Sequence, residues 1–148
     1  ERLRRLVEEV YLHRALMDDP ATVVQDRTIY EDAEIFAANL YGQGHINERD
    51  YKMYRELYDT LCLTLAPPDV MIFLNCPVKT LRKRIATRGR AMEADIPTEY
   101  LKRLNGLYAD WRERYDLSPV IELETDKLDY LTDLVDRIDV FKQIEKYL

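Results

Sequence analysis

Apolar residues recur at intervals of three and four positions in several long stretches of the chain. This spacing puts them on one face of an α-helix, so we predict helices over 1–17, 29–40, 47–65, 77–88, 98–111 and after 129. In the first of these, the charged residues form a mostly solvated face. The sequence leaves open whether part of that face lines a pocket.

Three shorter apolar runs lie between these helices and predict strands. Val23 and Val24 follow the turn at Pro20 and predict a short buried strand over 22–25. The unbroken run 70–74 is typical of a parallel strand that is covered on both faces, and 120–123 is a third strand. Strands alternating with helices predict an α/β fold: a three-layer parallel sheet with flanking helices. Because three strands make a small sheet for so many helices, we expect one more strand in front of them.

Single residues mark the boundaries of the predicted helices. Asn47 is a good N-cap, Pro77 suits the first turn of its helix, and Gly89 ends that helix. The tyrosines of the 47–65 helix share one face, which we interpret as core rather than as a ligand surface: Tyr51, Tyr54 and Tyr58.

Length and composition limit the class of protein. A chain of 148 residues with 47% hydrophobic and 34% charged residues is typical of one soluble globular domain, which we expect to span 1–148. A net charge of −6 argues against a nucleic-acid partner, which usually requires a basic surface. The spacing of Cys62 and Cys76 indicates neither a metal site nor a disulfide framework, so we expect a reducing, cytoplasmic setting. The apolar runs are too short to span a membrane.

Glycine usage excludes one phosphate-binding motif from these residues. The chain has 4 glycines, and none begins a G-x-x-x-x-G-K-[ST] phosphate loop. The sequence also opens in the middle of a helical pattern, without a methionine or a cap. We therefore expect an N-terminal portion to be missing.

Asp26 and Arg27 directly follow the first predicted strand. Ligands of open α/β sheets bind at the carboxyl ends of the strands, so these two side chains lie where a site is expected. The alternative is an ordinary turn whose acidic and basic side chains face water. One such pair is a weak motif, and the pattern alone does not decide between the two.

Arg84, Arg88 and Arg90 form a second cluster, around the end of the 77–88 helix. Arg84 and Arg88 share a helical face, and Gly89 lets the following loop fold back. Guanidinium groups match phosphate oxygens two at a time, so we favour a polyphosphate clamp over a solvated basic helix end. Phosphoryl transfer also requires a carboxylate for Mg²⁺, for which Asp26 is the best candidate.

These residues together resemble the deoxynucleoside kinases. The resemblance rests on two ordered motifs, Gln25-Asp26-Arg27-Thr28-Ile29-Tyr30-Glu31-Asp32 with Phe36, and Arg84 with Arg88-Gly89-Arg90 and Glu93. The resemblance extends from Val23 to Leu123. The first motif is most similar to that of the bacterial deoxyadenosine-type members. The resemblance implies a P-loop kinase-like fold of the nucleoside kinase type whose first strand and phosphate loop are missing here.

On the acceptor side, the resemblance implies a role for each matching residue. Asp26 helps to position Mg²⁺, and Arg27 contacts the 5′ region of the acceptor and the catalytic carboxylate. Asp32 faces the nucleobase and Phe36 stacks on it, while Glu93 binds the 3′-hydroxyl of the sugar.

On the donor side, the resemblance implies an ATP site. Arg84 lies against the adenine, and Arg88 and Arg90 form a lid over the phosphates. The loop 126–129, with Lys127, borders the donor base.

The implied activity is ATP-dependent phosphorylation of the 5′-hydroxyl of a deoxynucleoside, with a purine expected, by a homodimer. The family's phosphate loop and general-base Glu are not among these residues, so we expect the chain by itself to lack kinase activity. Two alternatives stay open: a nucleoside monophosphate kinase of the thymidylate type, and a non-catalytic kinase-like interaction module.

Overall fold

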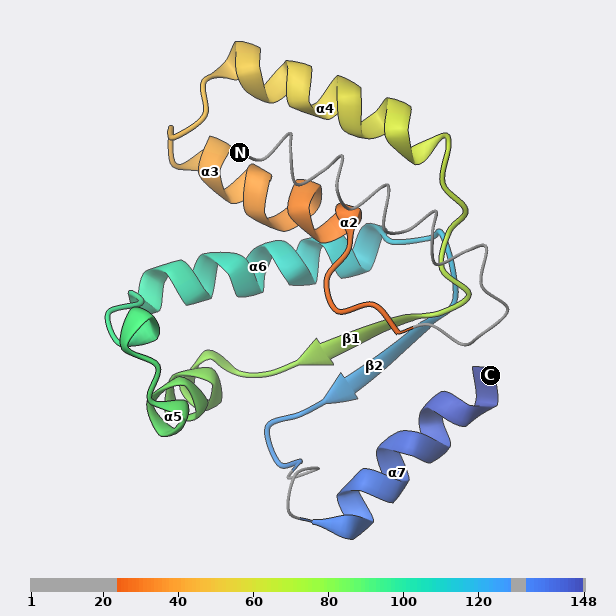
Figure 1. The fold of residues 1–148 in the computed structure, drawn as a ribbon. Coiled ribbons are helices and arrows are strands. Elements are labelled where there is room, and N and C mark those ends of the chain that lie inside the picture. The colour runs from red at the N-terminus through yellow and green to blue at the C-terminus, as the bar shows by residue number, and fades with distance from the viewer. Residues whose placement is uncertain (1–23, 129–132, 148) are drawn as a thin grey trace. The chain divides into compact units, whose positions relative to one another are not determined.

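A computed structural model describes residues 24–128 and 133–147 (Figure 1). The chain divides into two compact units. The first contains the described residues up to Ala66 together with Gly106–Glu113, and the second contains Pro67–Asn105 and the described residues from Arg114 onward. We describe each unit by itself.

A long helical segment followed by a second helix forms most of the described residues between 24 and 66 of the first unit. The segment comprises α2 (Ile29–Glu31), a π-helix η1 (Asp32–Ala37) and α3 (Ala38–Gly42) in direct succession. Helix α4 (Glu48–Cys62) returns alongside it and contacts η1 (Figure 1). The buried side chains of this pair include Ile29, Tyr30, Ala33, Ile35, Ala37, Tyr54 and Tyr58.

Local sequence explains where α4 begins, and packing explains the π-helical segment. The Asn47 side chain accepts a hydrogen bond of 2.9 Å from the Asp50 amide, which satisfies one of the unpaired N–H groups in the first turn of α4. Ala33, Ile35 and Ala37 are 0% exposed, so the π-helical segment is fixed by packing on its apolar side. π-helical turns occur often at functional sites, and this one contains both Asp32 and Phe36.

Two parallel strands lie at the centre of the second unit. β1 (Met71–Asn75) pairs with β2 (Val120–Glu124) in a register that runs from Met71↔Val120 to Asn75↔Glu124. Phe73, Ile121 and Leu123 are buried, and the Phe73 ring meets the Tyr115 ring edge-on at 6.1 Å. Parallel strands require a long crossover, and the connection between β1 and β2 contains the helices α5 and α6.

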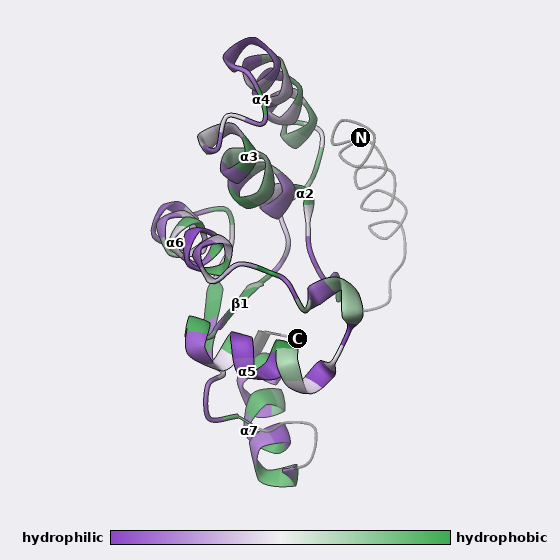
Figure 2. Cartoon of the chain, turned by 90° about the vertical axis from the view of Figure 1, so that its left-hand side faces the viewer, coloured by the Kyte–Doolittle hydropathy of each residue, from purple (hydrophilic) through white to green (hydrophobic). Residues whose placement is uncertain are grey.

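The remaining elements follow the strands. α5 (Val78–Arg88) ends at Gly89, whose φ of 66° is left-handed, and a 3-10 turn η2 (Ala91–Glu93) precedes α6 (Thr98–Arg114). After β2 come α7 (Leu134–Ile144), which contacts β2, and η3 (Glu145–Tyr147). α7 carries apolar turns (Figure 2), and its exposed apolar side chains are Leu134, Val135, Ile138 and Phe141.

Most of the predicted elements are confirmed, with boundaries shifted by a few residues. The helices over 29–40, 47–65, 77–88 and from 98 onward are present, as are the strands over 70–74 and 120–123. Tyr54 and Tyr58 are buried, as expected of core tyrosines. The helix over 1–17 and residues 22–23 lie outside the described part of the chain. That residues 1–148 form one domain stays a prediction.

Three details of the sequence interpretation are wrong. Val24 and Gln25, the described part of the predicted strand over 22–25, form no strand; among the described strands none pairs with them, and Val24 is 87% exposed. β1 is not covered on both faces, since Leu74 is 65% exposed. Pro77 is the N-cap of α5 rather than a residue of its first turn. Among the described residues, no helix is long and apolar enough to cross a membrane.

Candidate active site

The Asp26–Arg27 turn leads into α2 with an unusual backbone conformation. Arg27 has a φ of 66°, the left-handed region that residues other than glycine rarely adopt. Its guanidinium carbon lies 5.0 Å from the centroid of the Phe36 ring, a cation–π distance. Asp26 is exposed. The structure therefore brings Arg27 and Phe36 together, two of the residues that the sequence singled out.

Glu31 closes this turn from within α2, a role that sequence analysis missed. Its Oε2 accepts a hydrogen bond of 3.0 Å from the Thr28 amide, and its Oε1 accepts one of 2.8 Å from the Tyr108 hydroxyl. Burial raises the pKa of Glu31, although the hydrogen bond from Tyr108 opposes this. The signal in the sequence was Thr28 followed three residues later by a glutamate, the spacing of a capping box.

Asp32 is a buried carboxylate at the start of the π-helical segment. It is 8% exposed, and its Oδ2 accepts a hydrogen bond of 2.9 Å from the Tyr54 hydroxyl of α4. Phe36 is half-buried in the same segment. A buried carboxylate held by a neutral donor keeps a defined orientation, as hydrogen-bond recognition of a base requires.

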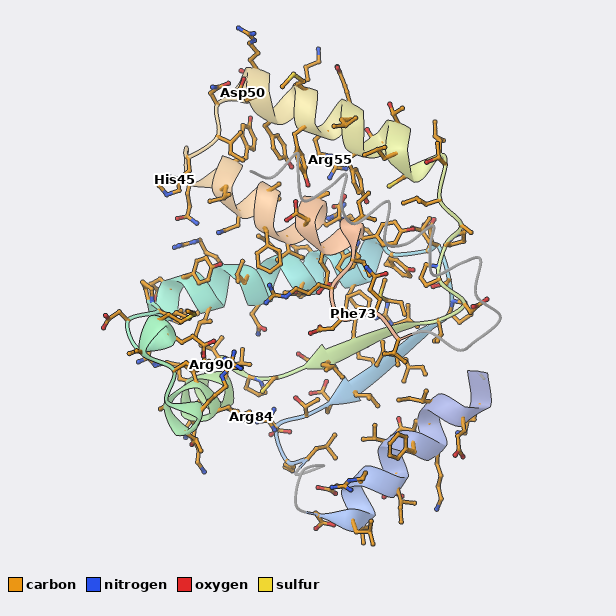
Figure 3. All side chains as sticks on the ribbon, in the orientation of Figure 1. His45, Asp50, Arg55, Phe73, Arg84 and Arg90 are labelled. Atoms are coloured by element: carbon orange, nitrogen blue, oxygen red, sulfur yellow. The ribbon has the colours of Figure 1, made fainter. Side chains whose placement is uncertain are left out.

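A second contact between α4 and the π-helical segment supports Asp32. Arg55 projects from α4 (Figure 3). Its Nη1 lies 2.7 Å from Glu34 Oε1, and its guanidinium lies over the Tyr58 ring at 4.7 Å. Burial alone would lower the pKa of Arg55, but the Glu34 carboxylate more than compensates and raises it. This ion pair joins the two helices that carry Tyr54 and Asp32.

In the second unit, Arg84 binds the loop that follows β2. Its Nη2 donates to the carbonyls of Thr125 and Leu128, the latter at 3.2 Å, and its Nη1 donates to Thr125 Oγ1 at 3.2 Å. Thr125 is 4% exposed. Arg84 thereby fixes the loop in which Lys127 is exposed, a contact between two predicted donor-site segments.

Arg88, Arg90 and Glu93 form a cluster after α5. Arg88 Nε donates a hydrogen bond of 2.9 Å to Glu93 Oε2, which also accepts from Arg88 Nη2. Arg90 Nη1 lies 3.5 Å from Glu93 Oε1. The side chains of Arg88 and Arg90 are 50% and 61% exposed, whereas that of Glu93 is 16% exposed. One carboxylate thus pairs with both predicted lid arginines.

A shallow cavity lies beside this cluster within the second unit. It has a volume of about 240 Å³, and its lining includes Ile85, Gly89, Arg90, Glu93 and Leu101. Apart from the adjoining backbone, no atom lies within 4 Å of the position of a Cβ on Gly89. The space beside this exposed glycine is therefore open.

The residues present fit a Mg²⁺ site with a single protein carboxylate. Within the described ranges, no group of three or more His, Cys, Asp or Glu side chains could hold a metal ion. Mg²⁺ needs no such cage, because it commonly binds one or two carboxylates together with water and phosphate oxygens. Asp26, exposed at the turn, suits that arrangement.

The predicted site residues fall into two groups, one in each unit. Asp26, Arg27, Asp32 and Phe36 belong to the first unit, and the second contains the rest: Arg84, Arg88, Arg90, Glu93 and Lys127. That the two groups face one triphosphate stays a prediction.

Comparison with known proteins identifies relatives of the chain. The sequence model of the family described as deoxynucleoside kinase matches residues 3–148. The chain is 32% identical over 130 residues to a deoxyadenosine/deoxycytidine kinase of Bacillus subtilis, covering 86% of this chain and 60% of the relative. It is 37% identical over 139 residues to a deoxyguanosine kinase of Lactobacillus johnsonii, covering 88% and 61%. The chain thus spans about three fifths of the length of these relatives.

The fold of this chain closely resembles solved structures of one enzyme. Deoxyadenosine kinase of M. mycoides with bound dCTP superposes with a TM-score of 0.70 at 26% identity, covering 99% of this chain and 75% of that one. The same enzyme with the products dCMP and a flexible dCDP gives a TM-score of 0.80 at 25% identity, covering 99% and 72%. The family match over nearly the whole chain, together with this P-loop nucleoside kinase fold, shows that the chain belongs to the deoxynucleoside kinase family.

Proposed function

We propose that the protein to which this chain belongs transfers a phosphate group from ATP to the 5′-hydroxyl of a deoxynucleoside, in nucleotide salvage. The observation that carries this proposal is the family match over residues 3–148, which includes both the Asp26–Arg27 turn and the Arg88–Gly89–Arg90 segment. The relatives described above are named as deoxyadenosine, deoxycytidine and deoxyguanosine kinases. We propose a purine deoxynucleoside as the preferred acceptor.

Four residues are proposed to act on the acceptor, each by its match to the family motif. Asp32, held by Tyr54, accepts hydrogen bonds from the base, and Phe36 stacks on the base. A base that leaves this buried carboxylate unpaired is rejected, because an unsatisfied buried polar group costs free energy. Arg27, above the Phe36 ring, contacts the 5′ end of the sugar, and Glu93 binds the 3′-hydroxyl.

The donor is bound by the arginines of the second unit. Arg84 and Lys127 lie at the adenine, and Arg88 and Arg90 close over the phosphates. In phosphoryl transfer the protein contributes mainly positioning and charge stabilisation, so guanidinium groups at the phosphates accelerate the reaction. Mg²⁺ held by Asp26 would offset negative charge on the phosphate oxygens. Arg88 and Arg90 exchange Glu93 for phosphate when the donor binds, and their exposure suits such an exchange.

We also propose a cytoplasmic homodimer. The cytoplasmic setting is supported by the two free cysteines, Cys62 and Cys76, which are typical of a reducing compartment. Sedimentation of the full-length protein tests the dimer, and a monomer at micromolar concentration would contradict it.

The activity is tested with the full-length protein, ATP and Mg²⁺. The four deoxynucleosides and their monophosphates are offered as acceptors, and product formation is followed by chromatography. We expect phosphorylation of deoxyadenosine or deoxyguanosine at the 5′ position. Turnover of monophosphates alone would instead indicate a thymidylate-type kinase, and no turnover of any acceptor would indicate a non-catalytic module.

A further inference from the structure

Glu31 and Tyr108 form a pair that none of the site roles above uses. Tyr108 lies on α6, 77 residues after Glu31 in the sequence, and its hydroxyl donates to Glu31 Oε1 at 2.8 Å. The other carboxylate oxygen, Oε2, accepts from the Thr28 amide at 3.0 Å. One carboxylate thus connects the residue after Arg27 to the part of α6, Gly106–Glu113, that belongs to the same unit.

The turn before Glu31 needs such a support. The left-handed backbone of Arg27 is unfavourable for a residue with a Cβ, and it persists only where the surroundings fix it. The Thr28 amide immediately follows this residue, so its hydrogen bond to Glu31 restrains the conformation at Arg27 directly. Above the turn, the Arg27 guanidinium is held over Phe36.

The electrostatics of the pair agree with this support. Burial raises the pKa of the Tyr108 hydroxyl, so Tyr108 keeps its proton and acts as the donor at neutral pH. Charges that face the Glu31 carboxylate include Arg27, which favours its ionised form, and Asp26, which opposes it. The carboxylate therefore interacts electrostatically with both residues of the turn.

We propose that Glu31 and Tyr108 are positioning residues that hold the Asp26–Arg27 turn in its reactive conformation. This inference rests on the proposed function, in which Arg27 contacts the reacting end of the acceptor. Tyr108 orients the carboxylate through Oε1, the carboxylate restrains the Thr28 amide through Oε2, and the restrained backbone presents Arg27.

The kinetic test uses Tyr108→Phe and Glu31→Gln in the full-length protein. Each variant lowers kcat about tenfold, because small displacements of a positioned group are costly, while KM for ATP changes less than about twofold. Tyr115→Phe is the matched control: like that of Tyr108, the Tyr115 hydroxyl forms a part-buried hydrogen bond, but its partner is Ser118. Unchanged kcat in Tyr108→Phe would overturn the inference.

A double-mutant cycle separates positioning from a general effect on folding. If Tyr108 acts through Arg27, Tyr108→Phe lowers kcat in the wild-type background but causes no further loss in an Arg27→Ala background. Equal losses in both backgrounds would mean that Tyr108 does not act through Arg27, which overturns the inference.

A measurement that does not depend on catalysis tests the inference independently of the proposed function. Hydrogen exchange of the Thr28 amide, followed by NMR, should become about tenfold faster in Glu31→Gln and in Tyr108→Phe but not in Tyr115→Phe. Unchanged exchange in the first two variants would overturn the inference. An inactive wild-type protein would instead overturn the proposed function, and the exchange rates would still decide whether this pair holds the turn.

Discussion

The two groups of site residues differ in how their carboxylates are held. In the first unit, Asp32 accepts a buried hydrogen bond from the Tyr54 hydroxyl, and Glu31 accepts a part-buried one from the Tyr108 hydroxyl. In the second unit, Glu93 pairs with Arg88 and Arg90, whose side chains are half or more exposed. Buried hydrogen bonds fix one geometry, whereas exposed ion pairs are weak and exchange readily. The difference suits the proposed roles, in which buried Asp32 selects the base and the exposed arginines exchange Glu93 for phosphate.

The largest expected effect is on activity, and it concerns the cluster of Arg88, Arg90 and Glu93. A substitution there should lower kcat strongly and change stability little. In the full-length protein, Arg88→Ala should lower kcat by about 10²–10³-fold, because it removes charge stabilisation at the transferred phosphate. Its free energy of unfolding should change by less than about 1 kcal/mol. Steady-state kinetics and urea denaturation measure the two quantities.

Lys79→Ala is the control for this variant, since Lys79 is an exposed cation on the same helix. A kcat for Arg88→Ala equal to that of the wild type would contradict the proposed role of Arg88 at the donor phosphates.

The next effect tests the buried contact at Asp32. Tyr54→Phe removes the hydroxyl that donates to Asp32 Oδ2, and should lower the free energy of unfolding by about 1–2 kcal/mol because a buried acceptor loses a partner. If Asp32 binds the base as proposed, KM for the preferred deoxynucleoside should rise about fivefold, since this carboxylate is then less well oriented. Chemical denaturation and kinetics with each deoxynucleoside measure these changes.

The matched variant is Tyr58→Phe, on the same helix and also buried, whose hydroxyl interacts with Cys62. If both variants raised KM equally, Tyr54 would have no special relation to Asp32.

A smaller effect is the change in the free energy of unfolding with pH, through Glu31. The pKa of Glu31 is raised above its usual 4.5, so the folded protein holds this proton more tightly than the unfolded chain does. The resulting contribution to stability is complete below pH 4.5 and is lost as the pH rises through the pKa of the folded state. The free energy of unfolding of the wild type, relative to Glu31→Gln, should therefore decrease as the pH rises above 4.5 and then level off. Denaturation of both proteins over that range measures it, and an increase would contradict the sign.

The smallest effect concerns the contact between Arg90 and Glu93. At 3.5 Å and with the arginine 61% exposed, this ion pair should contribute less than about 0.5 kcal/mol to folding. The difference in stability between the wild type and Arg90→Ala should disappear at high salt, where exposed charges are screened. A difference that persisted there would show that Arg90 stabilises the fold by packing.

The sequence predicted elements with strong periodicity and missed contacts between distant residues. The spacing of apolar positions was sufficient for α4 and β2, and Asn47 marked the start of α4 correctly. The strand predicted over 22–25 is absent at its described residues, Val24 and Gln25, because a β-branched residue favours a strand only where a neighbouring strand pairs with it.

Among the site residues, local patterns found the arginines but not their partners. The spacing R-x-x-x-R-G-R was visible, and so were Asp26 and Arg27. Tyr54 and Tyr108 could not be linked to Asp32 and Glu31, because those contacts join residues 22 and 77 positions apart. Their periodicity indicated only which face of a helix they occupy. The π-helical turn at η1 was also not predictable, since it depends on packing around Ala33, Ile35 and Ala37.

That π-helical turn makes the segment sensitive to a change in residue number. A π-helix accommodates an extra residue relative to an α-helix, so deleting one residue between Ala33 and Ala37 would allow regular α-helical hydrogen bonding. Because the wide turn already absorbs that residue, the helical turns on either side would keep their relative orientation, and the change would be confined to the side chains of the wide turn. Asp32 and Phe36 both belong to this turn, so the deletion would alter how they are presented. A shorter segment would gain regularity at the expense of the residues that we propose to bind the base, so its length matters to that proposal as much as the identity of its side chains.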